Sequence, residues 1–88
     1  MSSPTTNDAE ALALAALAAT LTDERRALRF LELTGLDADS LRSCAGERRV
    51  LAATIAFLEA HEPDLVAVAE LIGSSPQVLI RARMELEA

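Results

Sequence analysis

The sequence predicts an all-α fold, a compact bundle of five or six short helices. Apolar residues make up 51% of the 88 residues, and most of them are Ala and Leu, which are strong helix formers. Residues that favour strands are scarce, because the chain has no Trp or Tyr and its only aromatic residues are Phe30 and Phe57. The apolar residues recur at helical spacing between caps and stops, and no stretch alternates like a half-buried strand.

The length of the chain fits one compact domain. Residues 1–7 are expected to form a disordered N-terminal tail, followed by a single helical domain over residues 8–88. The first helix is expected over residues 8–20, with Asn7 as its N-cap and Glu10 completing a capping box. Its predicted inner face is a stripe of three leucines, Leu14, Leu17 and Leu21.

The second helix is expected to start after Thr22 as its N-cap, with two acidic residues in the first turn, where the helix dipole favours them. It should end at Gly35, which fits the left-handed position of a helix stop. One face of this helix collects Ala27, Phe30, Leu31 and Thr34. A short third helix, capped by Asp37 and carrying Leu41 inward, should reach Cys44.

The fourth helix is expected over residues 47–61, and Pro63 then begins a fifth helix over residues 63–72. The apolar face of the fourth helix consists of Leu51, Thr54, Ile55 and Leu58. The fifth is apolar almost all round, so we expect it to be the most buried helix. Gly73 ends it, and a sixth helix, capped by Ser74 or Ser75 and beginning at Pro76, should run nearly to the C-terminus.

An internal similarity appears when the sequence is shifted by 38 residues. The matched pairs are Glu32 with Glu70, Leu33 with Leu71, Gly35 with Gly73, and Leu41 with Leu79. If this is a true repeat, the bundle consists of two three-helix units packed around a pseudo-two-fold axis. The alternative is chance similarity between two Ala-rich segments.

The charges are distributed unevenly along a chain of net charge −6 with no Lys. Six of the eight Arg lie in residues 25–49, which carry a net charge of +2. One interpretation is a solvated surface whose Arg side chains pair with acids of the same chain. The other is a contact site for an anionic partner, formed by Arg25, Arg29, Arg48 and Arg49. The acidic balance of the whole chain disfavours nucleic acids and anionic membrane surfaces as partners.

The strongest local motif joins the fifth and sixth helices, where Ala69, Gly73 and Leu79 have the spacing of a helix-turn-helix. In DNA-binding versions the second helix enters the major groove, but here that helix carries apolar and acidic residues as well as Arg. A structural corner is the other interpretation. Val78, Ile80 and Met84 are more apolar residues than one core-facing side needs, so they are a candidate partner contact.

Catalytic and metal-binding chemistry is scarce in this sequence. Cys44 is the single Cys and His61 the single His, too few for an ordinary zinc site or a Cys–His nucleophile with an orienting group. We expect no cofactor, no metal, no catalytic residues and no enzymatic activity. The apolar run at residues 11–19 is preceded by acids and not by Lys or Arg, so we expect a cytoplasmic protein without a membrane segment.

Two segments, residues 30–37 (FLELTGLD) and 60–65 (AHEPDL), followed by Gly73 and Pro76, carry a family resemblance. In these residues the chain resembles the bacterial domain-of-unknown-function family 3572, over about residues 9–86. The resemblance implies a small helical protein and supplies no catalytic or binding residues. We therefore expect a non-catalytic protein-interaction or structural module with an unknown protein partner, or a homodimer formed through the sixth helix. The alternative is a helix-turn-helix nucleic-acid-binding protein.

Overall fold

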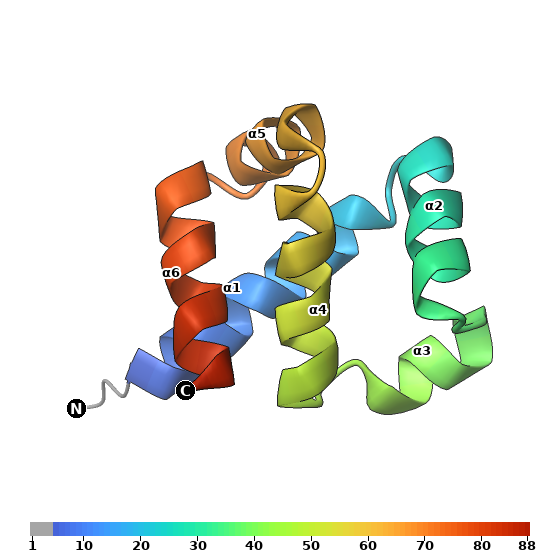
Figure 1. Ribbon diagram of the computed structural model, residues 1–88, viewed down its shortest axis with the longest axis horizontal. Helices are drawn as coiled ribbons and strands as arrows, with labels where there is room; N and C mark the ends of the chain where they lie inside the picture. Colours follow the sequence, from blue (N-terminus) through green and yellow to red (C-terminus); the bar gives the residue numbers. More distant parts are fainter. Residues whose placement is uncertain (1–4) are drawn as a thin grey trace.

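Residues 5–88 form six helices in the computed structural model, which describes side chains from Ala9 onward (Figure 1). The helices are α1 (Thr5–Thr20), α2 (Glu24–Thr34), α3 (Ala38–Cys44), α4 (Arg48–Glu59), α5 (Glu62–Leu71) and α6 (Pro76–Glu87). The predicted all-α bundle is therefore confirmed. Residues 1–4 of the predicted tail lie outside the described residues, and α1 already includes residues 5–7.

The centre of the fold is a three-helix arrangement in which α1, α4 and α6 all pack against one another. The helix α5 covers one end of this group, above α4 and α6 in Figure 1. The helices α2 and α3 lie to the side, and α2 has its most extensive helix contact with α1. The main apolar cluster belongs to α1, α4, α5 and α6, whereas a smaller cluster lies between α3 and the neighbouring helices.

The predicted inner face of α1 is wrong for two of its three leucines. Leu17 is buried, but Leu14 and Leu21 are 48% and 38% exposed. The buried face is instead made of small residues, namely Ala9, Ala13, Ala16 and Ala19, together with Thr20. Alanines let α4 and α6 approach the α1 backbone closely, and the burial of the larger α4 and α6 side chains in that space determines the orientation of α1.

Among the described residues α1 and α4 each have six buried positions and α5 has four, so α5 is not the most buried helix as predicted. The predicted apolar face of α4 is confirmed, and the full buried set is Val50, Leu51, Ala52, Thr54, Ile55 and Leu58. In α5, Val66 and Leu71 are 39% and 65% exposed. The apolar composition of α5 therefore exceeds what its position at the end of the bundle can bury.

The local signals for helix starts and stops are largely confirmed. Gly35 and Gly73 both have the predicted left-handed backbone, with φ of 73° and 69°. Asp37 accepts from the backbone N–H of Ser40, and Ser75 caps α6 by accepting from Val78. These bonds pair backbone N–H groups that the first turn of a helix leaves without a partner.

Two predicted helix starts need correction. The N-cap of α2 is Asp23, which accepts from the Arg26 backbone N–H, whereas the Thr22 hydroxyl donates to the carbonyl of Ala19 at the end of α1. His61, expected at the end of the fourth helix, is the N-cap residue of α5. The turn between α4 and α5 lies at residues 60 and 61, earlier in the chain than predicted, because α4 already ends at Glu59.

The 38-residue similarity extends to the helix boundaries. The N-cap positions of α2 and α5, Asp23 and His61, are 38 residues apart, and so are those of α3 and α6, Asp37 and Ser75. Two ion pairs also join positions separated by 38 residues, Arg26 with Asp64 and Arg48 with Glu10. A two-fold axis brings equivalent residues of two units into contact in this way. These contacts support the interpretation as two three-helix units. The first unit consists of α1, α2 and α3, and the second unit consists of α4, α5 and α6.

Packing, in contrast, does not repeat between the two units. The helix α6 buries Leu79, Ala82 and Leu86, whereas the shorter α3 buries Leu41. The residues that match the last turns of α6 form the turn after α3 and the start of α4. The third helix of the first unit is therefore shorter than that of the second, with 7 residues in α3 and 12 in α6.

The described part of the chain contains no single helix that is long and apolar enough to cross a membrane. The bent pair α5 and α6 passes that test together, by length and composition.

Candidate functional site

An apolar groove of about 370 Å³ lies between α2, α3 and α4. We call it the α2–α4 groove, and its lining is Leu33, Thr34, Leu36, Cys44, Arg49, Val50 and Ala53. Gly35 ends α2 at this point and lets the chain turn toward α3, so Leu36 reaches the small cluster beside Val50. Leu33 stands at the rim with 74% of its surface exposed.

A second, smaller groove of about 240 Å³ lies against α3 and contacts α1 and α2. Its lining is Leu17, Leu21, Leu31, Ala38, Leu41, Arg42 and Ala45. Each of the two grooves thus has one Arg among mainly apolar residues. Their occurrence around α3 follows from the short length of this helix, because one buried leucine fills the space that three buried residues of α6 fill in the second unit.

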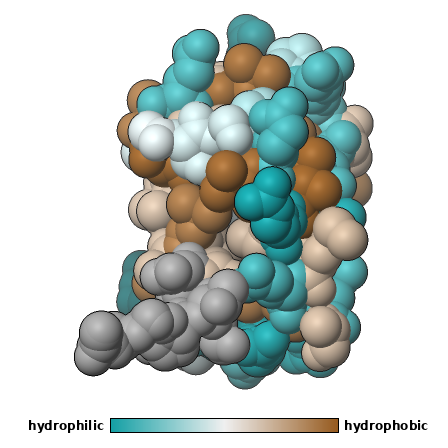
Figure 2. Space-filling view, turned by 90° about the vertical axis from the view of Figure 1, so that its left-hand side faces the viewer, coloured by the Kyte–Doolittle hydropathy of each residue, from teal (hydrophilic) through white to brown (hydrophobic). Residues whose placement is uncertain are grey.

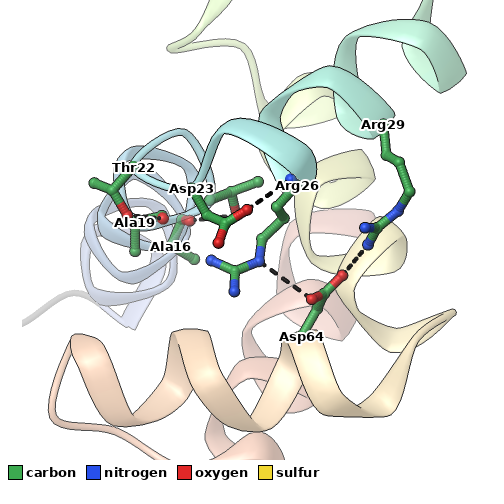
Figure 3. Close-up of polar contacts among 8 residues, drawn as sticks. Ala16, Ala19, Thr22, Asp23, Arg26, Arg29 and Asp64 are labelled. Carbon is green, nitrogen blue, oxygen red and sulfur yellow. Dashed lines mark hydrogen bonds and ion pairs between the residues drawn. The ribbon is translucent and has the colours of Figure 1, made fainter.

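The helix α2 is tied to the rest of the bundle by the carboxylate of Asp64 on α5 (Figure 3). Arg26 donates from Nε to Asp64 Oδ1 at 3.2 Å, and Arg29 donates from Nη2 to Asp64 Oδ2. The side chains of Arg26 and Asp64 are only 11% and 12% exposed, whereas that of Arg29 is 44% exposed. Removing one partner from such a shielded pair leaves the other charge poorly solvated, so the contact fixes where α2 lies.

Aromatic contacts continue this connection toward the core. The Arg29 guanidinium lies over the ring of Phe57 on α4, 5.6 Å from its centroid. Phe57 in turn meets Phe30 edge to face, with the ring centroids 5.3 Å apart. Arginine over an aromatic face and edge-to-face rings are both favourable arrangements. The side of α2 that faces the bundle is therefore fixed, and its other side remains on the surface.

The structure separates the four Arg residues that were predicted to form one contact surface. Arg29 pairs with Asp64 beneath α2, and Arg48 pairs with Glu10 and donates to the backbone carbonyl of Glu85. Arg25 is exposed in the first turn of α2. Arg49 lines the α2–α4 groove, and its side chain is 87% exposed, with Glu47 Oε1 at 3.3 Å. For Arg29 and Arg48 the geometry matches the first interpretation, pairing within the chain.

The three predicted contact residues of α6 do not form one strip. Val78 is 38% exposed and Met84 59% exposed, but Ile80 packs against the main core. Six residues after Val78, after more than one full turn, the side-chain direction of Met84 differs by about 240° around the helix axis. The two side chains therefore point to different sides of α6. On the side of the molecule where α6 lies, Figure 2 shows apolar groups interrupted by polar ones. A homodimer formed through α6 stays a prediction.

The helix-turn-helix alternative is not favoured by the surroundings of α6. The axes of α5 and α6 do bend by 97°, within the range of this motif. However, α6 packs against α1, α4 and α5, and its Arg83 is held by Glu59 of α4 and Glu87. Arg83 donates hydrogen bonds to these carboxylates, and the bond to Glu59 is the main cause of its raised pKa. A DNA-reading helix must instead present its polar side to the groove.

The single Cys and the single His lie on different parts of the fold. Cys44 ends α3 and lines the α2–α4 groove, whereas His61 is the exposed N-cap residue of α5. Among the described residues no group of three or more His, Cys, Asp or Glu could hold a metal ion. The lining of the α2–α4 groove offers apolar contact with one cationic side chain, Arg49.

One protein-family model matches nearly the whole chain. The model described as "Protein of unknown function (DUF3572)" matches residues 6–88. The chain belongs to this family. No curated protein and no solved structure matches it. The resemblance seen in residues 30–37 and 60–65 is thus confirmed, and those segments include Leu33 and Leu36 of the groove as well as Asp64.

Sequence reasoning missed the α2–α4 groove. Leu33 was a usable signal, because it lies outside the predicted inner face of α2 and directly precedes the helix stop. The position of Ala53 gave no signal, since an exposed Ala on a helix is ordinary. The sequence places Asp64 in the first turn of a predicted helix, where an acid is favourable, but its pairing with Arg26 depends on the tertiary arrangement.

Proposed function

We propose that this DUF3572 protein is a non-catalytic protein-interaction module that binds a partner through the α2–α4 groove. The observation that carries the proposal is an open apolar groove with the exposed Leu33 at its rim and the side of α2 toward the bundle already fixed by Asp64. Exposed apolar concavities on small proteins commonly serve as contact sites. The function of the chain would then lie beside α2 and α3, the two helices with the fewest buried residues.

The repeat supplies matched controls for a direct test. Leu33 and Leu71 occupy equivalent positions and are 74% and 65% exposed, but only Leu33 belongs to the groove lining described above. A photo-crosslinking amino acid is placed at either position in the full chain, expressed in the native host. We expect one discrete protein adduct at position 33 and none of the same mass at position 71.

A second pair of variants links the adduct to the groove itself. Ala53→Glu places a charge in the groove, and Ala15→Glu places one at the equivalent exposed position of α1. We expect Ala53→Glu to abolish the adduct at position 33 and Ala15→Glu to preserve it, with both variants folded by circular dichroism. An adduct that persists in Ala53→Glu, or that forms equally at position 71, rules out the groove as the docking site.

A further inference from the structure

The start of α4, at the lip of the α2–α4 groove, differs from the other described helix starts. Asp23, Asp37 and Ser75 cap α2, α3 and α6 with side-chain hydrogen bonds, and α5 has two acidic residues in its first turn. The N-cap of α4, Glu47, makes no side-chain cap bond, and the first turn of α4 contains no acidic residue. It begins with Arg48 and Arg49, at the end of the helix where the dipole already favours negative charge.

This arrangement gives the groove a positive lip on an otherwise acidic molecule. The chain has a net charge of −6, and of the six Arg in residues 25–49 the structure places Arg49 in the groove lining. Arg48 is engaged by Glu10, but Arg49 extends into solvent with 87% of its side chain exposed. Its contact with Glu47 at 3.3 Å joins two exposed groups, and such surface pairs stabilise a fold by less than about 1 kcal/mol.

The floor of the groove is apolar. Leu36, Cys44 and Val50 face it, and its volume of about 370 Å³ is at the low end for ligand sites. A nucleic-acid backbone needs several cations along its path, whereas this groove offers one Arg beside an apolar floor. The combination fits a segment that carries apolar side chains and carboxylates together.

From this charge complementarity we infer that the occupant of the α2–α4 groove is an acidic amphipathic helical segment of a partner protein. Its apolar side chains lie against Leu36, Cys44 and Val50, and a flanking Asp or Glu carboxylate meets Arg49 and the first turn of α4. Helices that place an apolar face in a groove are a recurring mode of recognition. This inference rests on the proposed function, because it assumes that the groove binds a protein.

The test uses two synthetic 12-residue peptides added to the full chain. Both have leucines at i, i+3 and i+7, and the remaining positions are alanine with glutamate in one peptide and lysine in the other. Binding is followed by the backbone amide NMR shifts of the protein and by the rate of iodoacetamide reaction at Cys44. Cys44 is the single Cys of the chain and lines the groove, so it reports occupancy without a substitution.

We expect the glutamate peptide to shift amides of residues 33–36 and 49–53 and to slow Cys44 alkylation, with at least tenfold higher affinity than the lysine peptide. Arg49→Glu should lower the affinity for the glutamate peptide about tenfold. Arg81→Glu, a charge reversal at an exposed site on α6, should leave the affinity unchanged. Arg49→Gln provides a milder variant in which the loss is smaller but in the same direction.

Equal affinity for the two peptides would overturn the acidic preference while leaving an apolar docking groove, so the proposed function would stand. Shifts confined to α6, or no shifts at millimolar peptide, would overturn the inference, and the photo-crosslinks at position 33 judge the proposed function separately. If the same amides shift with protein concentration alone, the groove takes a second copy of this chain and the inference fails.

Discussion

The helices α3 and α6 occupy equivalent places in the two units, yet they are packed very differently. Each follows a left-handed glycine, Gly35 or Gly73, and each starts at a capped first turn. The helix α6 has 12 residues and packs against α1, α4 and α5, whereas α3 has 7 residues and leaves a groove on either side. The same glycine stop and helix cap therefore precede a helix in a closed core, α6, and a helix beside open grooves, α3.

This difference shows that helix boundaries and closure of the core have separate causes. Caps and glycine stops determine where a helix begins and ends, and the stop and cap before α3, Gly35 and Asp37, match those before α6, Gly73 and Ser75. Core closure depends on how much helix follows the cap. After α3 the chain must turn into α4, whereas α6 continues for more than one further turn and buries Leu86. Asp64 holds α2 in position beside the open surface. We place the function in the α2–α4 groove on that surface.

The largest expected difference between the units comes from truncating their equivalent leucines. Leu79→Ala removes a fully buried side chain from the main core and should lower the free energy of unfolding by about 3–5 kcal/mol. Leu41→Ala removes one from the small cluster beside the grooves, where neighbours can relax, and should cost about 2–3 kcal/mol. Urea unfolding of both variants measures the difference. Equal costs would mean that the two cores are equally tight.

The two ion pairs that join equivalent positions should contribute unequally. Asp64→Asn leaves Arg26 largely shielded and without its carboxylate, and should cost about 2–3 kcal/mol, less than for a fully buried pair because Arg29 is 44% exposed. Glu10→Gln disrupts a pair whose side chains are 37–43% exposed and should cost less than about 1 kcal/mol. Chemical denaturation at low and high salt distinguishes them, and a larger cost for Glu10→Gln would contradict the assigned role of Asp64.

The two glycine stops should respond alike, because the local turns of the units are alike. Gly35→Ala and Gly73→Ala each force a side chain into a left-handed backbone, at a cost of about 1 kcal/mol. Neither added Cβ meets another atom within 4 Å, so backbone strain is the main source of the cost. Thermal unfolding of the two variants provides the comparison. A difference much beyond 1 kcal/mol would show that the turns differ in more than conformation.

Acid should weaken the first unit before the second. Backbone hydrogen bonds from Arg26 and Ser40 hold the pKa of Asp23 and Asp37, respectively, below their ordinary value of 3.8. Because these folded-state pKa values are lowered, the capping contribution is present above pH 3.8 and is lost as pH falls through the folded values. Amide NMR between pH 6 and pH 2 should show α2 and α3 fraying first. Simultaneous loss of all helices would contradict this order.

Much of the fold could be predicted from the sequence, because helix boundaries depend on local chemistry. Asp37, Gly35, Gly73 and Pro76 each specify a backbone conformation through neighbouring residues alone. The orientation of α1 could not be predicted, since Leu14 and Ala13 are both reasonable core residues and the approach of α4 and α6 selects the alanine. Helical spacing defines a face but does not say which face the partner helices need.

The groove could not be predicted, because it arises from a mismatch between the length of α3 and the space around it. The two ion pairs between the units could have been predicted more readily from the sequence. The 38-residue alignment already places Arg26 opposite Asp64 and Glu10 opposite Arg48, opposite charges at equivalent positions. Interpreted with a two-fold axis in mind, that pairing predicts contact between the units.

The central claim, that α2 and α3 are the less tightly packed part of the molecule, is tested most directly by native-state hydrogen exchange. With increasing denaturant, amides of α2 and α3 should exchange through an opening of lower free energy than amides of α4 and α6, with a smaller dependence on denaturant. The Asp64→Asn variant should widen this gap. One opening free energy shared by α2, α3, α4 and α6 would contradict the account.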